Sequence, residues 1–146
     1  MTKFKFKLEP VLQHRESKEK QAVLAQADAQ QKYFSLLDSL NKTRDNFERS
    51  LKATNNGDCF DILNNIMYRQ YLKNKMIKEE KKVSKAHQQL QKCRKRTLEA
   101  RKQKLIMEKL KENQLAHHIK EENSKEQKQL DEMANQIILR NQTYPF

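Results

Sequence analysis

Helix-breaking residues are almost absent from this chain of 146 residues, and this restricts its possible folds more than any other feature. The only glycine is Gly57, and the only prolines are Pro10 and Pro145. Disordered chains are usually rich in both types, whereas a chain without them can stay helical over long distances. Because only 36% of the residues are hydrophobic, a compact globule would bury too little apolar surface to offset its ordering entropy. The sequence therefore predicts long helices that bury a narrow apolar stripe.

One turn signal divides the chain into two helical segments. Residues 55–58 read NNGD, in which Asn and Gly tolerate the left-handed backbone of a helix reversal and Asp58 suits an N-cap. Pro10 fits the first turn of the first helix. We therefore expect an all-α fold, a long two-helix antiparallel coiled-coil hairpin whose C-terminal helix overhangs the first. Its parts are a helix over about residues 10–53, a turn over 54–60 and a helix over about 61–142, in one domain that spans 1–146.

Apolar residues on both helices recur at alternating steps of three and four, the spacing of a coiled-coil seam. On the second helix the repeat runs to Thr97 and is then predicted to slip by one residue, continuing through Leu98 and Leu105. The expected seam comprises Ala22, Ala29, Tyr33, Leu36, Leu40 and Phe47 on the first helix, and Leu72, Met76, Val83, Ala86, Leu90, Cys93, Thr97, Leu98, Leu105, Ile119, Leu130, Met133 and Ile137 on the second.

The position of the turn predicts how the two seams pair. If the chain folds back at Gly57, the numbers of facing residues add up to about 112, so that Leu40 meets Leu72 and Ala29 meets Val83. In this register about 35 residues at the end of the second helix have no partner, and an isolated helix gains little from propensity alone. We expect this overhang to be the least stable part unless a partner covers it.

Nearly all of the excess positive charge lies in residues 73–111, which carry 15 basic and 4 acidic side chains. Such a segment attracts an acidic protein surface, nucleic acid or anionic lipid. A basic helix before a leucine repeat is also found in basic leucine zippers, but the positions of their base-reading residues hold Ala86, Gln89 and Leu90 here. The pattern favours a protein-binding or solvated face, with a nucleic-acid-binding coiled coil as the alternative. The basic patch comprises Lys92, Arg94, Lys95, Arg96, Arg101, Lys102 and Lys104.

The sequence contains no pattern typical of an enzyme or a metal site. The adjacent His117 and His118 point about 100° apart on a helix, and Cys59 and Cys93 lack the spacing of metal-binding cysteines. One glycine cannot build a phosphate-binding loop, and no apolar run approaches the roughly 20 residues that span a bilayer. We expect a cytoplasmic, non-enzymatic protein that uses no cofactor and no metal and does not insert into membranes.

Aromatic residues gather near the turn. Phe47 can lie in the seam, whereas Phe60, Tyr68 and Tyr71 exceed what two helices can cover. Because Tyr68 and Tyr71 lie three residues apart, they share a helix face, which we predict to be a docking patch.

Several segments resemble the FliJ family of bacterial flagellar proteins. The opening FKFKLEPVLQHRESKEKQAVLAQA, Phe4 to Ala27, is similar to the family's F-x-F-x-L-x-x-V/L-L-x-x-R/K-x-x-x-E start. The segment YRQYL, Tyr68 to Leu72, is similar to its Y-Q-Q-F segment early in the second helix. The stretch Lys104 to Glu112 and the DEMA of Asp131 to Ala134 also match, so the resemblance covers nearly the whole chain.

The resemblance implies a role in the flagellar type III export apparatus, at the inner face of the cell membrane at the flagellar base. FliJ-type proteins are non-enzymatic stalks that bind in the hexameric export ATPase, stimulate it, and contact the cytoplasmic domain of the membrane export gate. Injectisomes have counterparts of the same plan, and the sequence does not decide between the two systems or settle whether substrate chaperones also bind.

The resemblance also assigns the two ends of the hairpin. Lys75 and Lys78 depart from the apolar surface expected for gate binding. The residues expected to contact the ATPase ring are Phe4, Phe6, Leu8, Leu12, Leu98 and Leu105, and those expected to contact the gate are Leu40, Phe47, Tyr68 and Tyr71.

Overall fold

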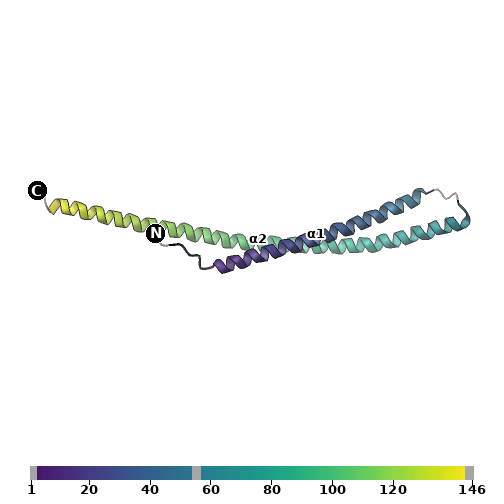
Figure 1. Ribbon diagram of the computed structural model, residues 1–146, viewed down its shortest axis with the longest axis horizontal. Coiled ribbons are helices and arrows are strands. Elements are labelled where there is room, and N and C mark those ends of the chain that lie inside the picture. The colour runs from purple at the N-terminus through teal and green to yellow at the C-terminus, as the bar shows by residue number, and fades with distance from the viewer. Residues whose placement is uncertain (1–2, 54–56, 144–146) are drawn as a thin grey trace. The chain divides into compact units, whose positions relative to one another are not determined.

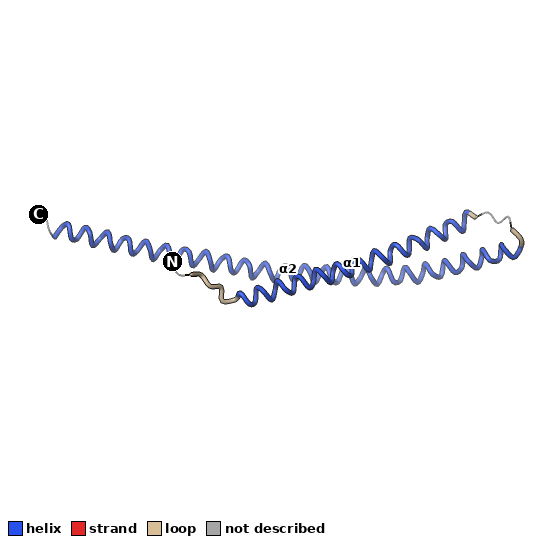
Figure 2. Tube along the Cα trace, in the orientation of Figure 1, coloured by secondary structure: helices blue, strands red, loops and turns tan. Residues whose placement is uncertain are grey.

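The computed structural model describes residues 3–53 and 57–143, and within these ranges it contains two helices. Helix α1 runs from Glu9 to Lys52, and helix α2 runs from Cys59 to Thr143 (Figures 1 and 2). The helices pack in opposite directions as a hairpin, and α2 is the longer one, which confirms the predicted fold class. The predicted turn residues Asn55 and Asn56 lie outside the described residues. The chain divides into two compact units: unit 1 comprises Met1–Glu16 and Lys102–Phe146, and unit 2 comprises Ser17–Arg101.

Helix α1 begins one residue earlier than predicted. The amide of Leu12 donates to the carbonyl of Leu8 at 3.0 Å, which starts the helical ladder. Pro10 lies in the first turn, where its missing N–H removes no helical hydrogen bond.

Helix α2 begins at an N-cap, as the sequence predicts. The amides of Asp61 and Ile62 donate to the carbonyl of Asp58 at 2.9 and 3.2 Å. Gly57 lies in a crowded position, because a Cβ at Gly57 would lie 2.8 Å from the Cβ of Asp61.

The seam of unit 2 is a regular heptad repeat on both helices. Seam positions at alternating steps of three and four are partly or fully buried from Glu19 to Ser50 on α1 and from Ile62 to Ala100 on α2. The predicted slip after Thr97 is wrong, since Thr97 is buried and Leu98 is 64% exposed. Thr97 is accommodated in the seam because its hydroxyl donates to the carbonyls of Ala22 and Cys93 at 3.2 and 3.0 Å.

Unit 2 pairs one heptad away from the predicted register. Ser39 Oγ donates to Glu79 Oε1 at 3.0 Å, and Arg69 Nη2 donates to the carbonyl of Ser50 at 2.6 Å. The residue numbers in these pairs add up to 118 and 119 instead of 112. A shift of seven keeps every seam position opposite another, so the apolar spacing fits both registers equally well. We attribute the choice to buried polar side chains, which need hydrogen-bond partners.

The core of unit 2 follows this register. Ala29, Leu90 and Cys93 form a buried cluster against which Tyr33 packs. Ala29 therefore packs with Leu90, and not with Val83 as predicted.

The register also leaves the start of α2 without an opposite residue on α1. With facing numbers that add up to about 119, the last α1 residue, Lys52, lies opposite Met67. Near this end of α2 several apolar side chains are exposed, namely Phe60, Leu63 and Ile66.

In unit 1, the extended segment before α1 packs against α2. Phe6 and Leu12 are each only 5% exposed, and the Phe4 ring lies 5.6 Å from the imidazole of His118. Lys111 Nζ lies 2.7 Å from Glu9 Oε2 and 5.8 Å from the centroid of Phe6. We call residues 4–12 and the α2 side chains that they contact the N-terminal clasp.

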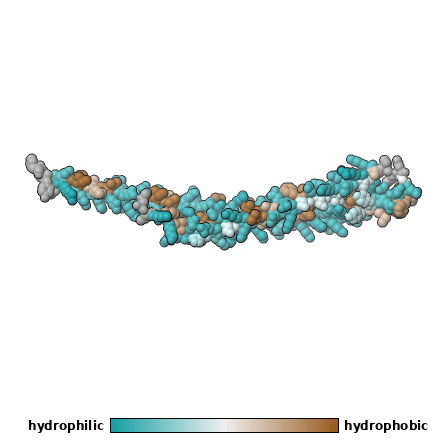
Figure 3. All heavy atoms as spheres, viewed as in Figure 1, coloured by the Kyte–Doolittle hydropathy of each residue, from teal (hydrophilic) through white to brown (hydrophobic). Residues whose placement is uncertain are grey.

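Beyond the clasp, α2 continues as the expected overhang. Every residue from Asn123 to Gln142 is exposed. The predicted register left about 35 residues of α2 without a partner. The contact between Phe4 and His118 places the start of the overhang after His118, so the overhang is shorter than predicted. The surface is mainly hydrophilic, and small apolar groups interrupt it, including one near the C-terminal end of α2 (Figure 3).

Candidate partner-binding surfaces

The N-terminal clasp unites four of the residues predicted to bind an ATPase ring. Phe6 and Leu12 are buried and hold the extended segment and the start of α1 in place, and their predicted contact with an ATPase ring stays a prediction. Phe4 is partly exposed and Leu8 is exposed, which leaves both accessible. The clasp therefore positions its accessible side chains through its buried ones.

The two leucines predicted for ring binding on α2 are accessible. Leu105, in unit 1, is 60% exposed, and Leu98, in unit 2, is exposed to a similar degree. Each follows a seam position by one residue, and one residue rotates a side chain by about 100° around the helix. Leu98 and Leu105 therefore form no part of the seam.

Sequence reasoning missed two exposed apolar residues of unit 1. Val11 and Ile106 are exposed on α1 and α2, respectively. Both are large apolar residues, so their type alone made them candidates for a binding surface. Only the observed seam shows that they lie outside the buried positions.

At the turn end, the predicted gate-binding residues have different environments. Leu40 is 3% exposed in the seam, where it stabilises the hairpin, and its predicted contact with a gate stays a prediction. Phe47 lies at the edge of the seam and lines a groove of about 260 Å³ with Leu51 and Ile66. The ammonium of Lys73 lies 5.9 Å from the Phe47 ring centroid. This groove is both apolar and cationic.

Tyr68 and Tyr71 are exposed on α2, and neither lines the Phe47 groove. Between them Arg69 points towards α1 and donates to the Ser50 carbonyl. Because each residue turns the helix by about 100°, Tyr68 and Ile66 lie on opposite sides of the direction in which Arg69 points. The four predicted gate residues thus form no single patch. Sequence reasoning missed Leu63 and Met67, which are also exposed on α2.

The predicted basic patch is also divided. In unit 2, Lys92, Lys95 and Arg96 are exposed on the outer side of α2, whereas Arg101 Nε lies 3.4 Å from Glu19 Oε1 on α1. Arg94, seven residues before Arg101, is exposed on that same flank.

In unit 1, Lys102 is exposed, and Lys104 is partly buried with its Nζ 3.8 Å from Glu108 Oε1. The basic run therefore winds around the helix and does not form one surface.

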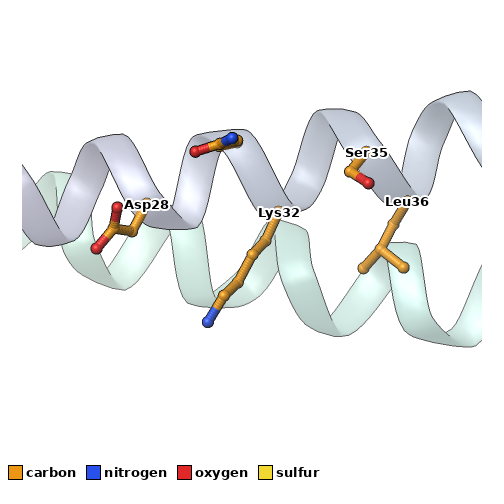
Figure 4. A pocket seen from close by; sticks show the side chains of 5 residues that line it. Asp28, Lys32, Ser35 and Leu36 are labelled. Carbon is orange, nitrogen blue, oxygen red and sulfur yellow. The ribbon is translucent and has the colours of Figure 1, made fainter.

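The described residues contain no group of three or more His, Cys, Asp and Glu side chains that could hold a metal ion. Cys59 is exposed and Cys93 is buried, and both are free thiols. Neither helix, over its described residues, has an apolar stretch sufficient to cross a membrane. A further groove beside α1 is shallow and lined by Asp28, Gln31, Lys32, Ser35 and Leu36, which lie along one open helix surface (Figure 4).

Comparison with known proteins identifies one family. The family model described as Flagellar FliJ protein matches residues 4–143, which include both helices and all of the N-terminal clasp. No curated protein and no solved structure shows a significant match. The resemblance found in the sequence is confirmed at the level of the family.

Proposed function

Because the chain belongs to the FliJ family of flagellar proteins, we propose that it is the non-enzymatic central stalk of the flagellar export ATPase. Members of the family are structural components of flagellar protein export. In our proposal, the end that carries the N-terminal clasp enters the ATPase ring and raises its rate of ATP hydrolysis. The turn end contacts the cytoplasmic domain of the export gate, so that the protein works at the inner face of the cell membrane at the flagellar base.

One observation supports the ring-facing end in particular. Leu8, Val11, Leu105 and Ile106 stay exposed in unit 1, although the clasp packs against α2. Exposed apolar side chains on a backbone held by buried contacts are typical of a surface that a partner covers. The flagellar description of the family favours flagellar export over an injectisome.

The test is the hydrolysis rate of the cognate export ATPase, titrated with the protein. We expect a saturating rise in rate, and a shift of the half-maximal concentration by about tenfold or more in the variant Leu8→Ser/Leu105→Ser, which removes two exposed contacts. The matched control Leu24→Ser/Phe34→Ser changes two exposed apolar residues of unit 2 and should act like the wild type. No rise in rate at any ratio would refute the stalk role, and equal shifts in both variants would refute the ring-facing end.

The gate contact is tested separately by pull-down with the cytoplasmic domain of the gate protein. Two exposed surfaces support our assignment of the turn end, the Phe47 groove and the pair Tyr68 and Tyr71. Leu51→Ser should weaken binding if the groove is used, whereas Tyr68→Ala/Tyr71→Ala should weaken it if the tyrosines are used. Retention of full binding by both variants would exclude the turn end as the contact.

A further inference from the structure

The two flanks of the hairpin in unit 2 carry different charge patterns. On one flank, acidic and basic side chains pair across the helices: Arg44 Nη2 lies 3.1 Å from Glu80 Oε1, and Arg101 Nε lies 3.4 Å from Glu19 Oε1. These pairs neutralise part of the positive charge of that flank.

The outer side of α2 and the adjoining opposite flank have no such pairs. In a heptad repeat, a given side of a helix is formed by the same positions in every seven residues. On this side of α2, such positions run from Lys75 to Arg96. The two carboxylates of α2 in that span do not neutralise it, because Glu79 is buried in the seam and Glu80 is paired with Arg44. No ion pair forms there among the residues that the structure describes. We define the cationic face by its exposed basic residues on α2: Lys75, Lys78, Lys81, Lys82, Lys85, Lys92, Lys95 and Arg96.

Helix α1 extends this face. Lys32 of α1 lines a groove of about 310 Å³ together with Lys82 and Lys85 of α2. The Lys32 side chain reaches away from α1 towards the side on which α2 runs (Figure 4). Asp28 lies beside Lys32 on α1, so the face retains a strong net positive charge with one nearby carboxylate.

We propose that the cationic face binds the surface of an anionic phospholipid bilayer. The eight basic residues of α2 cover 21 residue steps, or about 32 Å at a rise of about 1.5 Å per residue, and they form rows along one helix. A flat layer of anionic headgroups can meet all of these rows at once. The positions between the cations hold Gln88 and Gln89 and no aromatic residue, so binding is peripheral and electrostatic.

The shape of the face argues against duplex DNA as its partner. Each helix with its side chains is about 10–12 Å wide, so two helices side by side exceed the roughly 12 Å width of the major groove. Seven of the eight cations on α2 are lysines, which act as flexible point charges and lack the bidentate fork with which arginine grips phosphate. Both features fit a diffuse, planar distribution of negative charge.

The experiment measures co-sedimentation of the full-length protein with vesicles. We compare phosphatidylcholine vesicles that contain phosphatidylglycerol with vesicles of phosphatidylcholine alone. The protein should bind the anionic vesicles at about 0.1 M salt, and it should be released at about 0.5 M salt because the charges are exposed and screened. It should not bind the neutral vesicles.

Two variants with the same change in net charge locate the binding face. Lys82→Gln/Lys85→Gln/Lys92→Gln removes three cations from the face, and Lys20→Gln/Lys73→Gln/Arg94→Gln removes three exposed cations that lie away from it. A cation near an anionic membrane contributes about fivefold to partitioning, so the first variant should partition at least about tenfold more weakly. The control should lose much less. Equal helical circular dichroism in the three proteins excludes unfolding as the cause of a loss.

The alternative outcomes overturn the proposal. These are no binding to anionic vesicles at low salt, equal binding to neutral vesicles, and equal weakening in both variants. Binding to duplex DNA in a gel shift without binding to vesicles would assign the face to nucleic acid instead. The vesicle assay contains neither the export ATPase nor the gate, so its result is independent of the proposed stalk function.

Discussion

Two stretches of α2 with comparable apolar side chains have opposite environments. Between residues 72 and 97, Leu72, Leu90 and Cys93 are buried against α1. Between residues 123 and 142, Leu130, Met133, Ile137, Ile138 and Leu139 are all exposed. Both stretches are helical, so apolar content does not decide burial. The difference lies in whether a second helix is available at matching heptad positions, and this separates the stretch that stabilises the hairpin from the one that does not.

The largest expected effect is the loss of a buried leucine. Leu90 is 2% exposed within the cluster with Ala29 and Cys93, so Leu90→Ala should lower the free energy of unfolding by about 2–5 kcal/mol. The matched change Leu130→Ala, in the exposed stretch, should alter it by less than about 0.5 kcal/mol. Urea unfolding followed by circular dichroism measures both values. Similar losses in the two variants would remove the distinction between the stretches.

A smaller effect of opposite sign is expected at Glu79, a carboxylate within the buried stretch. Ser39 donates to its Oε1, but its Oε2 is buried and has no hydrogen-bond partner. Since an unsatisfied buried polar atom is costly, Glu79→Met should raise the free energy of unfolding by about 1 kcal/mol. Glu80→Met is the control, because Glu80 forms an exposed ion pair with Arg44, and such pairs contribute little. A clear loss of stability in Glu79→Met would show that the carboxylate is fully satisfied in solution.

The smallest effect is expected when the exposed stretch is removed. Deleting residues 123–146 should change the free energy of unfolding of the hairpin by less than about 0.5 kcal/mol, because residues 123–142 bury no side chain. The midpoint in urea and the mass from light scattering give the result. A loss as large as that of Leu90→Ala, or a fall in oligomeric mass, would mean that this stretch packs against a second copy of the chain.

Much of the fold was predictable, and the candidate surfaces were less so. The absence of helix breakers and the N-cap at Asp58 led to two helices whose observed bounds lie within one or two residues of those expected. The errors came from the seam. Leucine spacing suggested that Leu98 succeeds Thr97, whereas Thr97 stays in the seam by bonding to backbone carbonyls. The burial of Leu40 agrees with its place in the expected seam, whereas the burial of Phe6 and Leu12 depends on how the segment before α1 packs, which residue type alone does not give.

The sequence by itself determined that the chain forms two helices, that they pair in an antiparallel hairpin, and that positive charge concentrates in residues 73–111. These properties follow from local propensity, heptad periodicity and composition, which each segment carries without reference to the other. Only the tertiary structure decided the register, because registers that differ by seven residues align the same apolar positions. The register in turn determined which charged residues pair across the helices, since an ion pair such as Arg44–Glu80 depends on residues that are distant in sequence.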